Sequence, residues 1–172
     1  MTALTGFRAF GILALRLITG WVFLFAGIQK VFAAEPFSTA GFLSFGTAGT
    51  AEGAAEGAIV NPTNAFWVDL AANAQLMDVI NFIVPFGQIA IGVALVLGLA
   101  TRFAAVMGFL MMAGFTIAPW DFAHGVINYT ALIALTSLIL GVIRAGEVYG
   151  LDAIVDEQPI VKRTAALRYV LG

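Results

Sequence analysis

Long apolar runs constrain this chain of 172 residues more than any other feature, and the first of them contains an arginine. That run covers residues 9–32, with Arg16 in its middle and Lys30 near its end. About 20 apolar residues are enough to cross the hydrocarbon core of a bilayer. An ionisable side chain inside such a span is costly unless it reaches the interface or finds a partner. We therefore expect a membrane-spanning helix over residues 7–33, with Arg16 as the first residue to explain.

Three further apolar runs predict helices over residues 79–99, 103–118 and 126–143. The chain is 61% hydrophobic and 10% charged, whereas soluble domains carry about 25% charged residues. We interpret it as an all-α integral membrane protein, a four-helix bundle in the lipid bilayer. The first run is too long for the apolar part of a signal peptide and Arg16 interrupts it, so we expect a retained helix.

The composition also limits the chemistry. A net charge of −2 argues against a nucleic-acid partner. The absence of cysteine excludes disulfides, thiolate chemistry and cysteine-ligated iron–sulfur clusters within this chain. The single histidine, His124, cannot supply a bis-histidine haem site from one copy. We therefore expect neither haem nor an iron–sulfur cluster in this chain.

The expected organisation is one membrane domain over residues 1–145, with an outer loop at 34–78, and a cytoplasmic tail at 146–172. The second part of the loop has apolar residues at roughly helical spacing, which indicates a surface helix or the lead-in to the next span. Alanine and glycine recur every four residues over 90–98 and 100–108, which lets membrane helices approach closely. The acidic residues of the tail are expected to be solvated: Glu147, Asp152, Asp156 and Glu157. The end of the tail, residues 160–172, is basic and predicts a short amphipathic helix at the membrane.

Basic residues predict the topology, because lysine and arginine favour the cytoplasmic side. With four spans, six basic residues fall on one side: Arg8, Arg102, Arg144, Lys162, Arg163 and Arg168. Six acidic residues fall on the other: Glu35, Glu52, Glu56, Asp69, Asp78 and Asp121. We therefore expect a multi-pass protein of the cell membrane with both termini cytoplasmic.

One face of the first helix carries two cations and two glycines, and the glycines are expected to permit close approach of another helix. Arg16, Gly20, Gly27 and Lys30 are separated by intervals that place them on one side of an α-helix. Such a face can bind an anionic group, a lipid headgroup or a quinone carbonyl. The alternative is that both long side chains extend to the membrane interface. For Lys30 this second interpretation is favoured; for Arg16 the two are balanced.

Two other regions offer polar side chains near the membrane. Gln88 lies in the second span, where a glutamine seeks a hydrogen bond between helices. The loop and helix start at 119–130 hold Trp120, Asn128 and Tyr129, which we include with Arg16, Lys30 and Gln88 as candidate quinone-binding residues.

The same loop holds Asp121 and His124, three residues apart, which could relay protons as a catalytic pair. The plainer interpretation is a wet loop with its aromatic side chains at the interface. Two such ligands are too few for a metal site, and we predict none.

Four segments carry a resemblance to a known family: RLITGWVFLFAGIQKVF, TAGFLSFGTAG, GQIAIGVALVLGLATRFAAVMGFLMM and INYTALIALTSLILGVIRAGEVYGLD. In these the chain resembles the DoxX/DoxD family of small four-helix membrane proteins. Members include a membrane subunit of thiosulfate:quinone oxidoreductase, so the resemblance implies a redox-linked role with quinone as the electron carrier. Relatives often carry a glutamate where this chain has Gln88, and a glutamine cannot relay a proton as that acid could.

These observations lead to two functional hypotheses. The chain is a membrane subunit of a quinone-linked oxidoreductase, DoxD-like, in a prokaryotic respiratory membrane. Alternatively, it is a non-catalytic accessory subunit that packs against other membrane subunits or against copies of itself. A transporter is a weaker third option, because four helices without repeats need oligomerisation to form a path. A cavity holding Arg16, Gln88 and His124 would support quinone binding, whereas a filled interior would support a scaffold.

Overall fold

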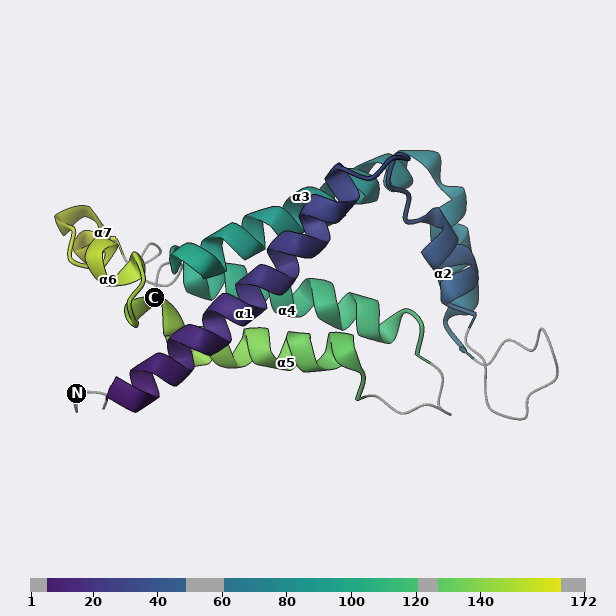
Figure 1. Ribbon diagram of the computed structural model, residues 1–172. Helices are drawn as coiled ribbons and strands as arrows, with labels where there is room; N and C mark the ends of the chain where they lie inside the picture. The colour runs from purple at the N-terminus through teal and green to yellow at the C-terminus, as the bar shows by residue number, and fades with distance from the viewer. Residues whose placement is uncertain (1–5, 49–60, 121–126, 165–172) are drawn as a thin grey trace.

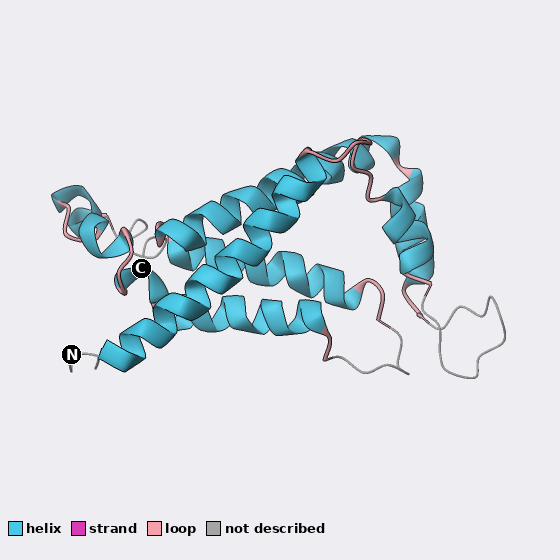
Figure 2. Cartoon of the chain, viewed as in Figure 1, coloured by secondary structure: helices cyan, strands magenta, loops and turns pink. Residues whose placement is uncertain are grey.

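The computed structural model describes residues 6–48, 61–120 and 127–164. Within these ranges the chain is helical and contains no β-strand (Figure 2). The long elements are α1 (Gly6–Val31), α3 (Ala74–Leu97), α4 (Thr101–Ile117) and α5 (Tyr129–Val142). The short ones are the π-helical turn η1 (Phe42–Gly46), α2 (Asn64–Ala72), the 3₁₀ turn η2 (Ala145–Glu147), α6 (Asp152–Val155) and α7 (Pro159–Arg163). The all-helical prediction is confirmed.

The long helices associate as two pairs, α1 with α3 and α4 with α5. In Figure 1 the two pairs lie close at one end and diverge toward the other. We call the close end the Arg16 end; it includes the α3–α4 turn, η2 and α6. The other is the Lys30 end, where α1 finishes and α5 begins, and where η1 and α2 lie beside the start of α3.

Glycines allow α1 and α3 to touch along their length. A Cβ atom at Gly27 would lie 2.7 Å from the carbonyl oxygen of Pro85, and one at Gly20 would lie 3.0 Å from the backbone nitrogen of Val96. Gly92 plays the same role on α3, because its Cα faces the backbone of α1. The prediction that Gly20 and Gly27 permit close helix approach is confirmed, and this contact fixes how Arg16 and Lys30 face the rest of the molecule.

The core joins the two pairs around Phe23, which is fully buried with Leu95 and Ala104. A Cβ atom at Gly108 would lie 3.0 Å from the Phe23 ring and 3.2 Å from the Ser137 hydroxyl. The small residue at 108 therefore makes room for the largest buried apolar side chain. This packing separates the polar groups of the Arg16 end from those of the Lys30 end.

The outward faces are strongly apolar. Large hydrophobic side chains are exposed along all four helices, including Ile18, Phe82, Leu110 and Leu132. Only α1 and α3, among the described helices, are both long and apolar enough to cross a membrane; α4 and α5 are apolar but shorter. Apolar outer surfaces of this extent suit contact with lipid. Four spans and the cytoplasmic placement of the termini stay predictions.

The expected surface helix near residue 66 is present but divided. α2 ends at Ala72 and α3 begins at Ala74, because Asn73 adopts an extended backbone (φ −87°, ψ 100°). Its side-chain oxygen accepts a hydrogen bond from the backbone N–H of Leu76 at 3.1 Å, which is the usual role of asparagine at a helix start. One residue thus stops one helix and starts the next. The expected basic helix at 160–172 lies mostly outside the described residues.

Candidate functional site

Arg16 is 1% exposed, so the protein itself surrounds its guanidinium group. Nη1 donates hydrogen bonds to the carbonyl oxygens of Ala145 (2.7 Å) and Val148 (2.9 Å). Nη2 donates to the carbonyl oxygen of Tyr149 (3.2 Å). The guanidinium is therefore held by protein groups and does not lie free among lipid headgroups. Its partners are backbone carbonyls of the segment that follows α5.

That segment is shaped to present its carbonyls. Arg144 and Tyr149, which flank it, both have positive φ (54° and 52°), a backbone conformation that is uncommon for residues other than glycine. Gly98 and Gly150 close over the guanidinium: a Cβ atom at either would lie 2.7 or 2.6 Å from Nη1 of Arg16. The tight turn after α3 and the α5 exit therefore meet on Arg16.

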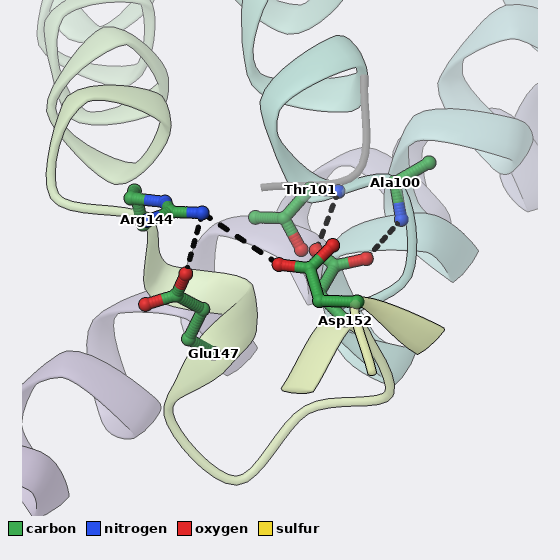
Figure 3. Close-up of polar contacts among 6 residues, drawn as sticks. Ala100, Thr101, Arg144, Glu147 and Asp152 are labelled. Carbon is green, nitrogen blue, oxygen red and sulfur yellow. Dashed lines mark hydrogen bonds and ion pairs between the residues drawn. The ribbon is translucent and has the colours of Figure 1, made fainter. Parts of the chain in front are cut away.

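Asp152 ties the same segment to the start of α4 (Figure 3). Its carboxylate accepts hydrogen bonds from the backbone N–H groups of Ala100 (2.7 Å) and Thr101 (3.0 Å), at the start of α4. Asp152 is fully buried, so the prediction that it belongs to a solvated tail is wrong. Burial raises the pKa of Asp152 above its ordinary value, and the two N–H groups oppose that rise. A carboxylate at a helix N-terminus also interacts favourably with the helix dipole.

Arg144 adds an ion pair at the edge of this region. Its guanidinium lies 2.7 Å from the Glu147 carboxylate and 3.6 Å from that of Asp156. The first of these pairs is visible in Figure 3. Its side chains are partly exposed, and such pairs contribute little stability, about 0–1 kcal/mol. The buried contacts of Arg16 and Asp152 carry the docking of the α5 exit.

Lys30, the next-to-last residue of α1, has a different environment. Its ammonium group donates one hydrogen bond to the carbonyl oxygen of Ala26 (3.2 Å) and lies 5.6 Å from the centre of the Phe37 ring. A lysine carries three N–H donors, so within the described part of the chain two are left for other partners. Lys30 is only partly buried.

A cavity of about 370 Å³ opens beside Lys30, between α1, α3, α4 and the start of α5. Gln88 lines it and is 2% exposed, yet its Oε1 has no hydrogen-bond partner among the described residues. A buried acceptor left without a donor costs about 1–3 kcal/mol. Tyr129 and Thr130 line the same cavity. Lys30, Gln88 and Tyr129, which the sequence proposed as binding residues, thus come together here.

Thr130, which lines the cavity, contacts further hydroxyl and amide groups. Its hydroxyl donates to Oδ1 of Asn128 (2.8 Å) and lies 2.8 Å from the Thr116 hydroxyl. Asn128 also caps α5 by accepting from the N–H of Ala131 (2.9 Å). Asn128 therefore reaches the cavity through Thr130. Thr116 and Thr130 were not among the predicted site residues, although threonines in apolar helices are a signal of hydrogen bonding between helices.

The other proposed site residues do not join this cluster. Arg16 is 14 positions before Lys30 on the same helix, a rise of about 21 Å, and lies in the opposite end of the structure. Trp120 follows α4, and its backbone N–H donates to the carbonyl of Ile117 (3.2 Å). Asp121 and His124 lie outside the described residues. The described part of the chain contains no group of three side chains suited to hold a metal ion.

Comparisons with known proteins assign this chain to a family. Neither the curated proteins nor the solved structures gave a match. The DoxX family model matches residues 11–124, about two thirds of the chain, from α1 past the end of α4. The matched range includes Arg16, Lys30 and Gln88. With its long apolar helices, this chain is a membrane protein that belongs to the DoxX family.

Proposed function

We propose that this chain is a quinone-binding membrane subunit of a redox complex, DoxD-like, and that the cavity beside Lys30 holds the quinone head group. The observation that carries the proposal is Gln88, a buried residue that lines a cavity of about 370 Å³ and whose Oε1 has no partner among the described residues. Ligand cavities combine mostly apolar walls with a few convergent polar groups, and this one does so.

The polar groups match a quinone ring in both redox states. A quinol carries two hydroxyl groups, one of which can donate to Oε1 of Gln88. A quinone carries two carbonyl oxygens, which can accept from Lys30 Nζ and from the Tyr129 hydroxyl. The apolar walls, formed by side chains such as Phe25, Met112 and Phe115, can pack on the ring. The bound group would supply two-electron redox chemistry, with any further redox centre in a partner subunit.

Arg16 is left out of this site. Both of its terminal nitrogens are used by backbone carbonyls, and Gly98 and Gly150 close over it. We assign Arg16 to the fold. Asp121 and His124, which lie between α4 and α5 in the sequence and outside the described residues, keep their proposed role as a proton-handling pair.

The alternative is a non-catalytic accessory subunit. The hydrogen bonds of the Arg16 end favour it, because they tie three parts of the chain together without providing a site for a ligand. In that case the Lys30 cavity would hold bulk lipid, and Gln88 would be a packing residue.

Binding to the purified protein in lipid nanodiscs tests the proposal. The probes are a benzoquinol and a naphthoquinol, each titrated against the wild type and against Gln88→Leu. Leucine removes the unpartnered acceptor, so the variant should be as stable as the wild type or more stable, yet bind the preferred quinol about tenfold more weakly. Equal binding of both proteins, or no binding of either probe to the wild type, would contradict the proposal.

A further inference from the structure

We propose that the ligand of this site carries a long isoprenoid tail, and that the tail runs from Lys30 beneath residues 37–43 to a chamber against Trp67. This inference rests on the proposed quinone site and assigns the remaining cavities of the Lys30 end to the same ligand. Three cavities lie in a row, and each shares lining residues with the next one. The cavity beside Lys30 has the most polar wall, and the last cavity has the most apolar wall.

The first junction lies at Lys30. The head cavity and a second cavity of about 310 Å³ share Lys30, Phe115 and Thr130 as lining residues. The second cavity lies under Phe37 and Phe42, in the segment that leaves α1. A group attached to a ring beside Gln88 can therefore pass Lys30 and enter it.

The second junction lies at two aromatic rings. Phe42 and Phe115 border both the second cavity and a third one of about 350 Å³. Their ring centres are 5.9 Å apart in an edge-to-face arrangement. Thr39 is also shared. The two cavities are thus separated by side chains, and rotation of these side chains can open a passage without moving the backbone.

The third cavity has the character of a tail chamber. It lies between η1, α2, α3 and α4, and large apolar side chains line it: Trp67, Leu70, Ile80, Ile83, Leu110 and Met111. No lysine, arginine, aspartate or glutamate borders it among the described residues. An apolar chain suits these walls, whereas a soluble anion does not.

Residues 37–47 form the roof of this path, and hydrogen bonds hold this roof at both ends. The Thr39 N–H and hydroxyl both donate to Oδ1 of Asn81 on α3, each at 2.8 Å. At the far end, Nδ2 of Asn61 donates to the carbonyl oxygens of Thr47 (2.7 Å) and Ala118, which joins the roof to the end of α4. A roof held in this way keeps the cavities open.

Gly114 gives a direct test. It lines the third cavity, and a Cβ atom added there meets no atom within 4 Å. Gly114→Leu should fill the chamber without disturbing the helix. Gly11→Leu is the matched control, because Gly11 is also in a helix, also has open space around it, and is exposed on α1. Binding is measured in nanodiscs with the preferred quinol ring, once carrying two isoprene units and once without a tail.

We expect Gly114→Leu to weaken binding of the tailed quinol about tenfold, to leave the tail-less ring unchanged, and Gly11→Leu to change neither. If Gly114→Leu binds both probes like the wild type, and the tail-less ring still depends on Gln88, the tail path is wrong and the quinone site stands. If no probe binds the wild type, the quinone site fails and the tail path with it.

A photoreactive quinol gives an answer that needs no substitution. With a diazirine at the end of its tail, cross-linking followed by mass spectrometry should label peptides that contain Trp67 or Leu110. Labelling confined to the lipid-exposed faces of α1 and α5 would overturn the path.

Discussion

Arg16 and Lys30 are cations on the same face of the same helix, yet their surroundings differ in kind. Arg16 is enclosed, and three backbone carbonyls accept from it. Lys30 makes one such hydrogen bond and lines a cavity together with Gln88, whose amide oxygen has no partner among the described residues. At the Arg16 end both terminal nitrogens of Arg16 are taken up by backbone carbonyls, although its Nε has no partner among the described residues. At the Lys30 end a lysine with donors to spare and an amide without a partner line an open cavity.

The difference follows from how the chain returns to each end. At the Arg16 end, the α5 exit folds back over the α3–α4 turn, and the N–H groups of Leu151 and Asp152 donate to the carbonyls of Leu97 and Gly98. At the Lys30 end the two helix pairs diverge (Figure 1), and side chains from η1 and α2 line the additional cavities there. In this molecule the charged residue that points to a ligand site is therefore the one whose donors are not used up by the fold.

The same substitution at both cations gives the sharpest contrast. Arg16→Met should lower the free energy of unfolding by about 3 kcal/mol or more, because buried carbonyls lose their donor. Lys30→Met should change it by less than about 0.5 kcal/mol. Thermal unfolding in one detergent measures both. Equal stability of the two variants would remove the distinction between the ends.

Glycine-to-alanine substitutions test whether the Arg16 end is packed more tightly than the Lys30 end. In Gly150→Ala the added methyl would collide with Arg16 Nη1 and the Gly146 carbonyl, so we expect a loss of about 1–3 kcal/mol. Gly114→Ala enters open space in a helix and should be neutral or stabilising by up to about 1 kcal/mol. Chemical denaturation of both variants provides the comparison. A Gly150→Ala protein as stable as the wild type would show that the Arg16 end is loosely packed.

Lys30→Met should act on ligand binding. We expect quinol affinity to fall about tenfold, because a donor to the ring oxygen is lost. Lys30→Arg keeps the charge and a donor and should retain most of the affinity. Quinol titration in nanodiscs measures this, and unchanged affinity in Lys30→Met would exclude the lysine from the site.

Asp152 predicts a small dependence of stability on pH. Its folded-state pKa is raised, with burial as the main cause. Its contribution is therefore fully present below about pH 4 and is lost as the pH rises through the raised value. Asp152→Asn lacks this titration, so the wild type should lose stability relative to the variant as the pH increases from about 4. The opposite slope would show that the N–H groups of Ala100 and Thr101 outweigh burial.

The sequence predicted the helices well because their signal is local. Apolar runs placed all four long helices within five residues of their observed ends, and the spacing of Gly20 and Gly27 predicted close helix contact. The same pattern could not show that Arg16 meets Ala145, Val148 and Tyr149, since those residues are more than 120 positions away.

The candidate site was predictable in part. Lys30, Gln88 and Tyr129 stood out as polar groups in or next to apolar helices, and the fold brings them to one cavity. Asp152 was mistaken for a tail residue because an acidic side chain after a helix usually faces water. Its apolar surroundings, Leu151 before it and Ile154 and Val155 after it, were the available sign that the segment packs against other elements.

Native mass spectrometry of the protein, extracted gently from its own membrane, tests the central claim most directly. The wild type and Gln88→Leu would be compared for bound small molecules. The account predicts a quinone or quinol on the wild type and its loss from the variant, with both proteins equally folded. Phospholipid alone on both proteins would contradict a quinone site at the Lys30 end and would favour the accessory role.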